Sequence, residues 1–370
     1  MKQKVLCGTD IIARNGFDFK GKCGLITNHT GVLCNLTSTI DLLKERCNLT
    51  ALFAPEHGVR GDKQAGIDVS SYIDDRTSLP VYSLYGDNTS EAEKTLTSLN
   101  TVIFDIQDVG ARFYTYQYTM TDTMKLCASH GVNFVVLDRP NPLGGIKAEG
   151  TILNRRFSSF VGRFPTPTRS ALTMGEFALM MNETENIDCN LSVIPMEGWH
   201  REMYYDDTKL VFIQPSPNIP TTDTVFAYIG TCIFEGTNLS EGRGTTKPFE
   251  LIGAPWLNRE KILKMLEPQK GVILRECSFT PTFSDYKNTF CHGIQLHITD
   301  RNSFAPFEVG IRLLDAIRKT HKEFEMKSFI TNLLGTDEIL KPDFSPDSFI
   351  EHQAQKVAEW QKLSKKWYLY

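Results

Sequence analysis

The chain has 370 residues, of which 41% are hydrophobic and 23% are charged, and its formal net charge is −4. This length is enough for two domains of ordinary size, and the composition argues against wholesale disorder. No basic stripe is present to neutralise phosphates and no apolar run approaches about 18 residues, so neither a nucleic-acid partner nor a membrane span is expected.

The nine cysteines are scattered singly, without a CxxC pair. This spacing argues against a zinc ribbon or a redox dithiol, so we expect reduced thiols and no metal. The opening sequence MKQKVLCGTD lacks an apolar h-region, so no signal peptide is visible. The chain as given is therefore expected to be cytoplasmic, or periplasmic or secreted if an export signal was removed.

Short apolar runs alternate with helical stretches in the first half of the chain. The expected strands are Gly24–Ile26, Ala51–Phe53, Val102–Phe104, Phe134–Leu137 and Leu191–Pro195. The expected helices are Ser38–Cys47, Ser90–Leu99, Gln117–His130 and Met174–Thr184. Such alternation is typical of a Rossmann-like, doubly wound and mostly parallel α/β sheet. We expect this catalytic domain to cover residues 1–199.

The second half lacks that alternation. Three segments resemble strands without regular helices between them, namely Val225–Phe234, Val272–Phe279 and Gly293–Thr299. Helices are expected at 306–320 and 346–367. The pattern predicts a smaller α+β domain over residues 200–370, which we expect to bind substrate.

Polar residues follow each of the first four apolar runs. Because ligands bind at the carboxyl ends of parallel strands, these loops should meet at one rim. The candidate site residues in them are Asn28, His29, Glu56, His57, Arg60, Asp105, Gln107, Asp108, Arg112, Asp138, Arg139 and Asn141. No GxGxxG or Walker sequence is present, so no nucleotide cofactor is expected.

The Pro-Glu-His-Gly turn suggests acid catalysis. A glycosidase needs a carboxylic acid to protonate the leaving oxygen, and Glu56 fits that role, with His57 orienting it or tuning its pKa. Alternatively, Glu56 caps the following turn. Asp105, Asp108 and Asp138 have alternatives of their own, namely loop hydrogen bonds or a buried ion pair.

A glycine-rich loop in the second half, FEGTNLSEGRGTT, offers Glu235, Asn238, Glu241 and Arg243 for substrate contact. Its backbone amides can form an anion-binding nest, and Arg243 carries a planar fork that suits a carboxylate. The alternative is an ordinary glycine-rich turn.

Several long motifs resemble one known family, the exo-β-N-acetylmuramidases, which are peptidoglycan-recycling glycoside hydrolases formerly known as a domain of unknown function. These motifs are TNHTGV, ALFAPEHGVRGD, LPVYSLYG, VIFDIQDVGARFYTY, FVVLDRPNPLGG, FEGTNLSEGRGTTKPFELIGAPW and WYLY. The resemblance runs from about residue 8 to the C-terminus. It implies a Rossmann-like domain, a smaller second domain and a cleft between them.

The resemblance also implies release of N-acetylmuramic acid (MurNAc) from the non-reducing end of MurNAc-GlcNAc chains or muropeptides, with Glu56 as the catalytic glutamate. Arg243 or Arg169 is then expected to bind the lactyl carboxylate of MurNAc. The acetamido group of MurNAc, a protein nucleophile or an activated water all remain possible attackers. The alternative functions are a non-catalytic sugar-binding protein and, weakened by the missing phosphate loop, a nucleotide-sugar enzyme.

Overall fold

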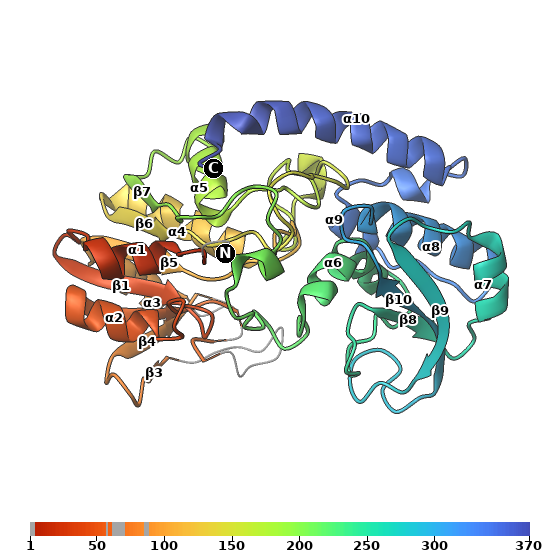
Figure 1. The fold of residues 1–370 in the computed structure, drawn as a ribbon, viewed down its shortest axis with the longest axis horizontal. Helices are drawn as coiled ribbons and strands as arrows, with labels where there is room; N and C mark the ends of the chain where they lie inside the picture. The colour runs from red at the N-terminus through yellow and green to blue at the C-terminus, as the bar shows by residue number, and fades with distance from the viewer. Residues whose placement is uncertain (1–3, 57, 61–70, 85–88) are drawn as a thin grey trace.

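The computed structural model describes residues 4–56, 58–60, 71–84 and 89–370. Two units lie side by side, a larger α/β unit built on a seven-stranded sheet and a smaller unit built on a three-stranded sheet (Figure 1). This architecture, a mostly parallel sheet with helices followed by a smaller mixed unit, confirms the predicted fold class.

The large sheet has the strand order β3-β4-β2-β1-β5-β6-β7 and is parallel except for the antiparallel edge pair β3 and β4. Its strands are β1 (Lys22–Thr27), β2 (Asn48–Ala54), β3 (Tyr72–Ile73), β4 (Pro80–Ser83), β5 (Thr101–Asp105), β6 (Asn133–Leu137) and β7 (Leu191–Ile194). All five strands expected from the sequence are present, and β3 and β4 are additional.

Helices cover both faces of this sheet. They are α1 (Gly8–Asn15), α2 (Thr39–Arg46), α3 (Ser90–Leu96), α4 (Tyr116–His130) and α5 (Met174–Thr184). Leu25 of β1 belongs to the core under α1 and α2, whereas its neighbour Ile26 belongs to the core under α3, α4 and α5. Because successive strand residues point to opposite faces, this alternation is what a doubly wound sheet requires.

The smaller unit is built on an antiparallel sheet of order β8-β10-β9. Its elements are α6 (Thr222–Thr231), β8 (Leu251–Ala254), α7 (Arg259–Met265), β9 (Val272–Phe279), β10 (Cys291–Ile298), α8 (Pro306–Thr320), α9 (Ile330–Leu334) and α10 (Pro346–Ser364). Short 3-10 turns lie at Arg155–Phe157, Tyr205–Thr208, Cys232–Gly236, Glu338–Leu340 and Lys365–Trp367.

The expected strand Val225–Phe234 is wrong, because the segment forms α6 and the turn after it. Every residue from Thr224 to Thr231 is buried. A helix buried on all sides shows no 3.6-residue pattern, and its valine, phenylalanine and isoleucine residues resemble a core strand. The hydroxyl of Thr221, which accepts a hydrogen bond from the backbone N–H of Thr224, marks the start of the helix.

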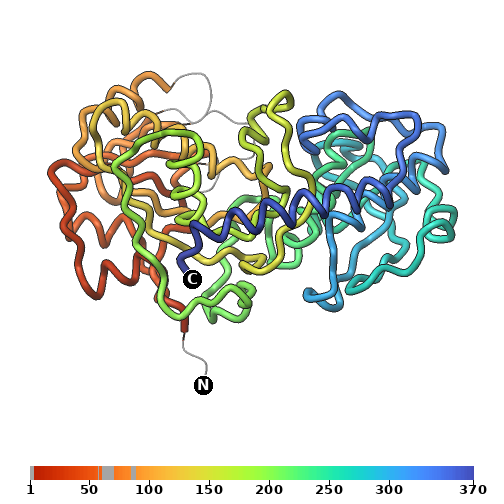
Figure 2. Tube along the Cα trace, turned by 90° about the horizontal axis from the view of Figure 1, so that it is seen from above, coloured from red at the N-terminus to blue at the C-terminus, as the bar shows by residue number. Residues whose placement is uncertain are grey.

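The last helix, α10, crosses from the smaller unit back to the larger one, as seen from above in Figure 2. The chain end is then fastened to the first unit. Trp367 Nε1 donates to Glu183 (3.0 Å), and the Tyr370 hydroxyl donates to Asp138 Oδ2 (2.8 Å). The C-terminal segment therefore contacts both units, and the domain boundary near residue 199 stays a prediction.

Candidate active site

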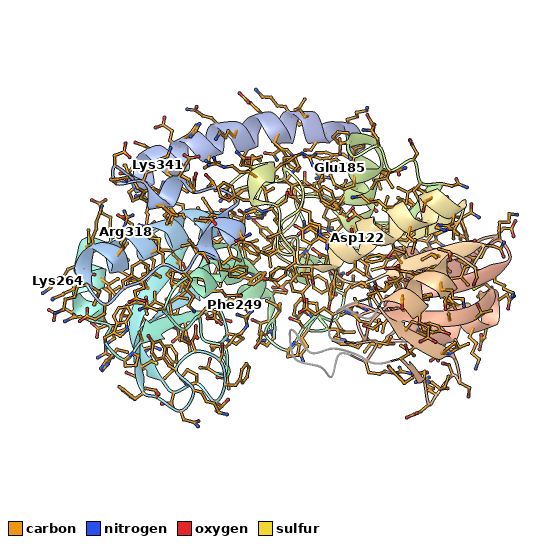
Figure 3. All side chains as sticks on the ribbon, turned by 180° about the vertical axis from the view of Figure 1, so that it is seen from behind. Asp122, Glu185, Phe249, Lys264, Arg318 and Lys341 are labelled. Carbon is orange, nitrogen blue, oxygen red and sulfur yellow. The ribbon has the colours of Figure 1, made fainter. Side chains whose placement is uncertain are left out.

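A cavity of about 560 Å³ lies where the two units meet, and residues of both units line it. The first unit contributes Glu56 from the end of β2 and the aromatic segment that leads into α4. The second contributes Tyr228 of α6, Arg243, and Phe249, which is labelled in Figure 3. The other lining residues are Phe113, Tyr114, Thr115, Tyr116, Phe160, Val161, Ser216, Asn218, Ile219, Cys232, Glu235, Phe283, Ser284 and Leu333.

Glu56 lies two residues beyond β2, half-buried on the wall of this cavity. The Thr115 hydroxyl, just before α4, donates a hydrogen bond to Glu56 Oε2 (2.8 Å). This location agrees with the rim expected from the sequence. His57 lies outside the described residues, so its expected role stays a prediction.

Aromatic rings form a wall beside Glu56. Tyr114 contacts Tyr116 edge to face (4.9 Å between ring centroids), and Tyr228 contacts Phe249 in the same way (4.6 Å). Tyr116 donates to the backbone carbonyl of Pro215 (2.8 Å), and burial raises the pKa of its phenol. These buried rings form a fixed part of the cavity lining.

Two predicted residues of the first loop serve this wall and its surroundings. Asn28 donates through Nδ2 to the Tyr116 hydroxyl (3.0 Å), while its Oδ1 accepts from the backbone N–H of Thr30 (2.9 Å). His29 Nε2 lies 2.6 Å from the backbone carbonyl of Gln214. Asn28 thus orients one ring of the wall, and His29 ties the loop to the connection between the units.

Three charged residues of the glycine-rich loop form a cluster at the cavity. Arg243 binds Glu235 through Nη2 and Glu241 through Nη1, both at 2.8 Å, and its guanidinium lies over the ring of Phe249 (4.8 Å). Burial raises the pKa of Glu241, although Arg243 opposes the shift. Asn238 instead holds the segment at Glu323 and Glu325. The loop therefore brings one cation, Arg243, and one carboxylate, Glu235, to the cavity, while Glu241 is buried outside the cavity lining.

The predicted residues at the ends of β5 and β6 are buried in a hydrogen-bonded framework. Asp105 pairs with Arg139 (2.5 Å). Asp138 accepts from the Thr173 hydroxyl (2.7 Å) and the backbone N–H of Gly175 (2.8 Å). The cavity lining includes none of these three predicted residues, and the alternatives of a buried ion pair and loop hydrogen bonds describe their contacts.

Other predicted rim residues hold loops together. Gln107 donates to the carbonyl of Pro140 and Asn141 to that of Leu172, both at 2.8 Å. Asp108 is buried and accepts from the backbone N–H of Gly110 (2.7 Å), and burial raises the pKa of its carboxyl to about 7.

Three predicted arginines are also engaged with protein groups. Arg60 pairs with Asp74 (2.6 Å) and Arg169 with Glu149 (2.8 Å). Arg112 donates to the backbone carbonyl of Leu333 (2.8 Å) and so joins the first unit to α9 of the second. Of the residues predicted from the sequence, the cavity thus brings together Glu56, Glu235 and Arg243.

Several residues of the cavity wall were not predicted from the sequence. Tyr228 escaped notice because its segment was taken for a strand. Phe249 and Phe283 belong to irregular segments without a helix or strand periodicity. Thr115 directly precedes a helix, where a threonine is common and does not by itself indicate a binding site. For the aromatic residues Phe113, Tyr114 and Tyr116, just before or at the start of α4, the sequence favoured core or helix packing, with one of them as a sugar-stacking platform as the alternative.

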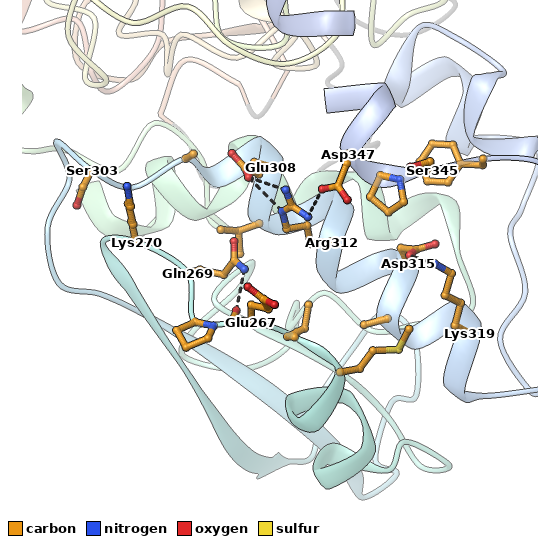
Figure 4. Close-up of a pocket in the computed structure, with 18 residues that line it drawn as sticks. Glu267, Gln269, Lys270, Ser303, Glu308, Arg312, Asp315, Lys319, Ser345 and Asp347 are labelled. Carbon is orange, nitrogen blue, oxygen red and sulfur yellow. Dashed lines mark hydrogen bonds and ion pairs between the residues drawn. The ribbon is translucent and has the colours of Figure 1, made fainter. Parts of the chain in front are cut away.

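A larger hollow of about 790 Å³ lies on the second unit, between α7, α8 and the start of α10 (Figure 4). Five of its charged residues already pair with one another. Arg312 binds Glu308 (3.0 Å) and Asp347 (2.7 Å), and Lys319 binds Asp315 (2.8 Å). No strand of the parallel sheet ends there, so the cavity between the units is the better candidate site.

Two comparisons with known sequences point to the same family. The family model described as exo-β-N-acetylmuramidase NamZ, N-terminal, matches residues 23–223, and the C-terminal model of the same family matches residues 226–370. The curated peptidoglycan β-N-acetylmuramidase NamZ of Bacillus subtilis (strain 168) is 45% identical, over 100% of this chain and 92% of its own length.

Solved structures agree as well. One crystal structure of a DUF1343 family protein from Bacteroides fragilis has a TM-score of 0.88 at 35% identity and covers 99% of both chains. A second from the same organism has a TM-score of 0.80 at 29% identity, covering 100% of this chain and 99% of that one. The chain therefore belongs to the exo-β-N-acetylmuramidase family of glycoside hydrolases.

Proposed function

We propose that this chain releases MurNAc from the non-reducing end of peptidoglycan fragments, with Glu56 as the general acid. The activity rests on a relative that is named a peptidoglycan β-N-acetylmuramidase and is similar over the whole chain. The role of Glu56 rests on one observation, a half-buried carboxyl at a strand end on the wall of a cavity lined by both units. A carboxyl in this position can protonate the oxygen of a bound glycosidic linkage.

The second catalytic group is proposed to come from the substrate. Asp105 and Asp108, the carboxylates considered from the sequence, are buried outside the cavity lining, and Glu235 is paired with Arg243. If the acetamido group of MurNAc attacks its own anomeric carbon, the enzyme needs an acid/base but no nucleophile of its own. This route gives net retention, so NMR of the first-formed product should show the β-anomer. Initial formation of the α-anomer would refute it.

We assign the lactyl carboxylate of MurNAc to Arg243 rather than Arg169. Both arginines pair with carboxylates and keep a buried Nε–H without a hydrogen-bond partner, but Arg169 is 1% exposed and outside the cavity lining, whereas Arg243 lines the cavity. An unpartnered guanidinium N–H beside a cavity suits a carboxylate acceptor.

The test of Glu56 uses the dependence of acid catalysis on the leaving group. Glu56→Gln removes the proton donor, so cleavage of the MurNAc-GlcNAc disaccharide should slow by about 10²- to 10⁴-fold. Cleavage of 4-nitrophenyl MurNAc should slow much less, because nitrophenolate departs without protonation. Initial rates on both substrates measure the difference.

Glu260→Gln is the matched control, because Glu260 lies exposed on α7 outside the cavity lining. It should leave both rates unchanged. Equal loss on both substrates in Glu56→Gln, or normal turnover of the disaccharide, would remove Glu56 from the role of general acid. Tight binding of the disaccharide by the unaltered chain without turnover would favour the sugar-binding alternative.

We propose a cytoplasmic location from the state of the cysteine thiols. All nine cysteines are free in the structure, which is typical of a reducing compartment and supports the cytoplasmic expectation. No helix among the described residues is long and apolar enough to cross a membrane. Fractionation of cells with detection of the native protein tests the location.

A further inference from the structure

A second hollow adjoins the active-site cavity. Its volume is about 650 Å³, and Thr115 and Phe160 line both hollows. Thr115 is also the residue whose hydroxyl binds Glu56. The two hollows therefore meet beside the carboxyl that is proposed to protonate the scissile oxygen.

The floor of this second hollow is one face of α4 and the residue before it. Thr115, Thr119, Asp122, Leu126 and Ser129 all line it, and their spacing of three or four residues places them on a single helical stripe. Asp122 is labelled in Figure 3. At 1.5 Å per residue the stripe is about 21 Å long, which is longer than one pyranose ring. We call this hollow the α4 groove.

An exposed aromatic ring stands where the groove meets the active-site cavity. Phe160 is 60% exposed at the tip of a turn closed by the backbone hydrogen bond from Ser159 N to Gly162 O (2.7 Å). Its ring stacks on Phe329 at an interplanar angle of 13°. Because that contact covers one face and most of the residue stays exposed, the other face is open to a ligand.

The charges of the groove balance. Its charged lining residues are Glu93, Asp122, Lys125 and Arg163, two of each sign, and Arg163 pairs with Asp122. A groove without net charge that begins at an aromatic face suits a ligand of low charge with an apolar ring face, such as an N-acetylated sugar.

We propose that the α4 groove holds the leaving saccharide, that is, the GlcNAc unit and the sugars that follow it, and that Phe160 stacks on this saccharide. The assignment rests on the proposed function, because it takes the bond at Glu56 as the one that is cleaved. MurNAc then occupies the cavity between the units, and the remaining chain runs along α4. By stacking on the leaving saccharide, Phe160 would make the enzyme prefer longer glycans as substrates.

The experiment compares two substrates with alkyl leaving groups, the methyl β-glycoside of MurNAc and the tetrasaccharide MurNAc-GlcNAc-MurNAc-GlcNAc. Chemistry at Glu56 is of the same kind for both, but only the tetrasaccharide reaches into the groove. Phe160→Ala should lower the tetrasaccharide-to-methyl-glycoside ratio of kcat/KM by about three- to ten-fold, the value of one aromatic contact. Phe160→Trp should preserve the ratio.

Two further variants sharpen the result. Thr119→Trp fills the groove one turn further along α4 and should lower the same ratio. Phe290→Ala is the matched control, because Phe290 is 56% exposed on the second unit and lines neither hollow. It should leave the ratio unchanged.

An unchanged ratio in both Phe160→Ala and Thr119→Trp would overturn the α4 groove proposal while leaving the proposed function intact. Failure of the unaltered chain to cleave either substrate would instead overturn the proposed function. If the ratio falls only when the tetrasaccharide carries a stem peptide, the groove binds peptide and the saccharide assignment is wrong.

Discussion

The buried ion pair between Asp105 and Arg139 at the end of β5 offers a test of whether a rim residue is structural or contacts substrate. Asp105 is fully buried and accepts from Arg139 Nε (2.5 Å) and Nη2 (2.9 Å), from Thr9 Oγ1 (2.9 Å) and from Thr39 Oγ1 (2.5 Å). Asp105→Asn keeps the shape but leaves a buried guanidinium without its counter-charge, and it turns an NH₂ group toward donors. Breaking a buried pair from one side costs about 3–5 kcal/mol.

Thermal unfolding measures this cost. For a chain of this size the melting temperature should fall by about 4–7 °C. Asp337→Asn is the control, because it breaks the exposed pair with Arg156 (2.6 Å) and should cost less than about 1 kcal/mol. Replacing both partners, as in Asp105→Asn with Arg139→Met, should cost less than the sum of the single changes, because no charge is then left unpaired.

Turnover decides whether Asp105 belongs to the framework. If it does, Asp105→Asn should retain kcat near that of the unaltered chain at a temperature well below its melting point. A variant as stable as Asp337→Asn but without turnover would show that the carboxylate contacts substrate. That result would refute the interpretation of the strand-end charges as structural.

Two further predictions concern Thr115 and Asp108. Thr115→Val removes the 2.8 Å hydrogen bond to Glu56, so kcat should fall by about ten-fold with little change in melting temperature, and Thr115→Ser should restore it. Burial raises the pKa of Asp108 to about 7, so between about pH 4 and 7 the folded chain holds a proton that the unfolded chain has released. The free energy of unfolding should therefore fall by at most about 4 kcal/mol as the pH rises through that range. Denaturant titrations at several pH values should show a weaker dependence of this free energy on pH for Asp108→Asn.

The core strands were predictable because each is a short apolar run bounded by turn residues. β5 and β6 begin within a residue of their predicted starts, and α5 has the predicted bounds Met174–Thr184. α1 was missed because Cys7 at its start gives no polar cap signal. β4 was missed because a proline opens it. The all-buried α6 was misread since periodicity fails where no side is exposed.

The candidate cavity lies at the rim expected from the sequence, but most of the residues that line it were not predicted. The rule that ligands bind at the ends of parallel strands located Glu56 correctly on the rim. The same rule selected Asp138, whose partners Thr173 and Tyr370 lie 35 and 232 residues away in sequence. A pattern of nearby residues does not contain such partners, so it does not tell a carboxylate that holds loops from one that faces a ligand.

The buried pairs explain how one carboxyl can be singled out on a rim crowded with charge. Asp105 is matched by Arg139 and Glu176 by Arg201 (2.6 Å), so their oxygens are occupied by donors within the fold. These pairs tie together segments at the ends of β5, β6 and β7. A rim held in this way would let Glu56, the proposed general acid, meet its substrate with little reorganisation. A substitution within the framework should therefore lower stability first, whereas one on the wall should lower turnover first. Measuring both losses for each polar residue at the rim assigns that residue to the framework or to the wall.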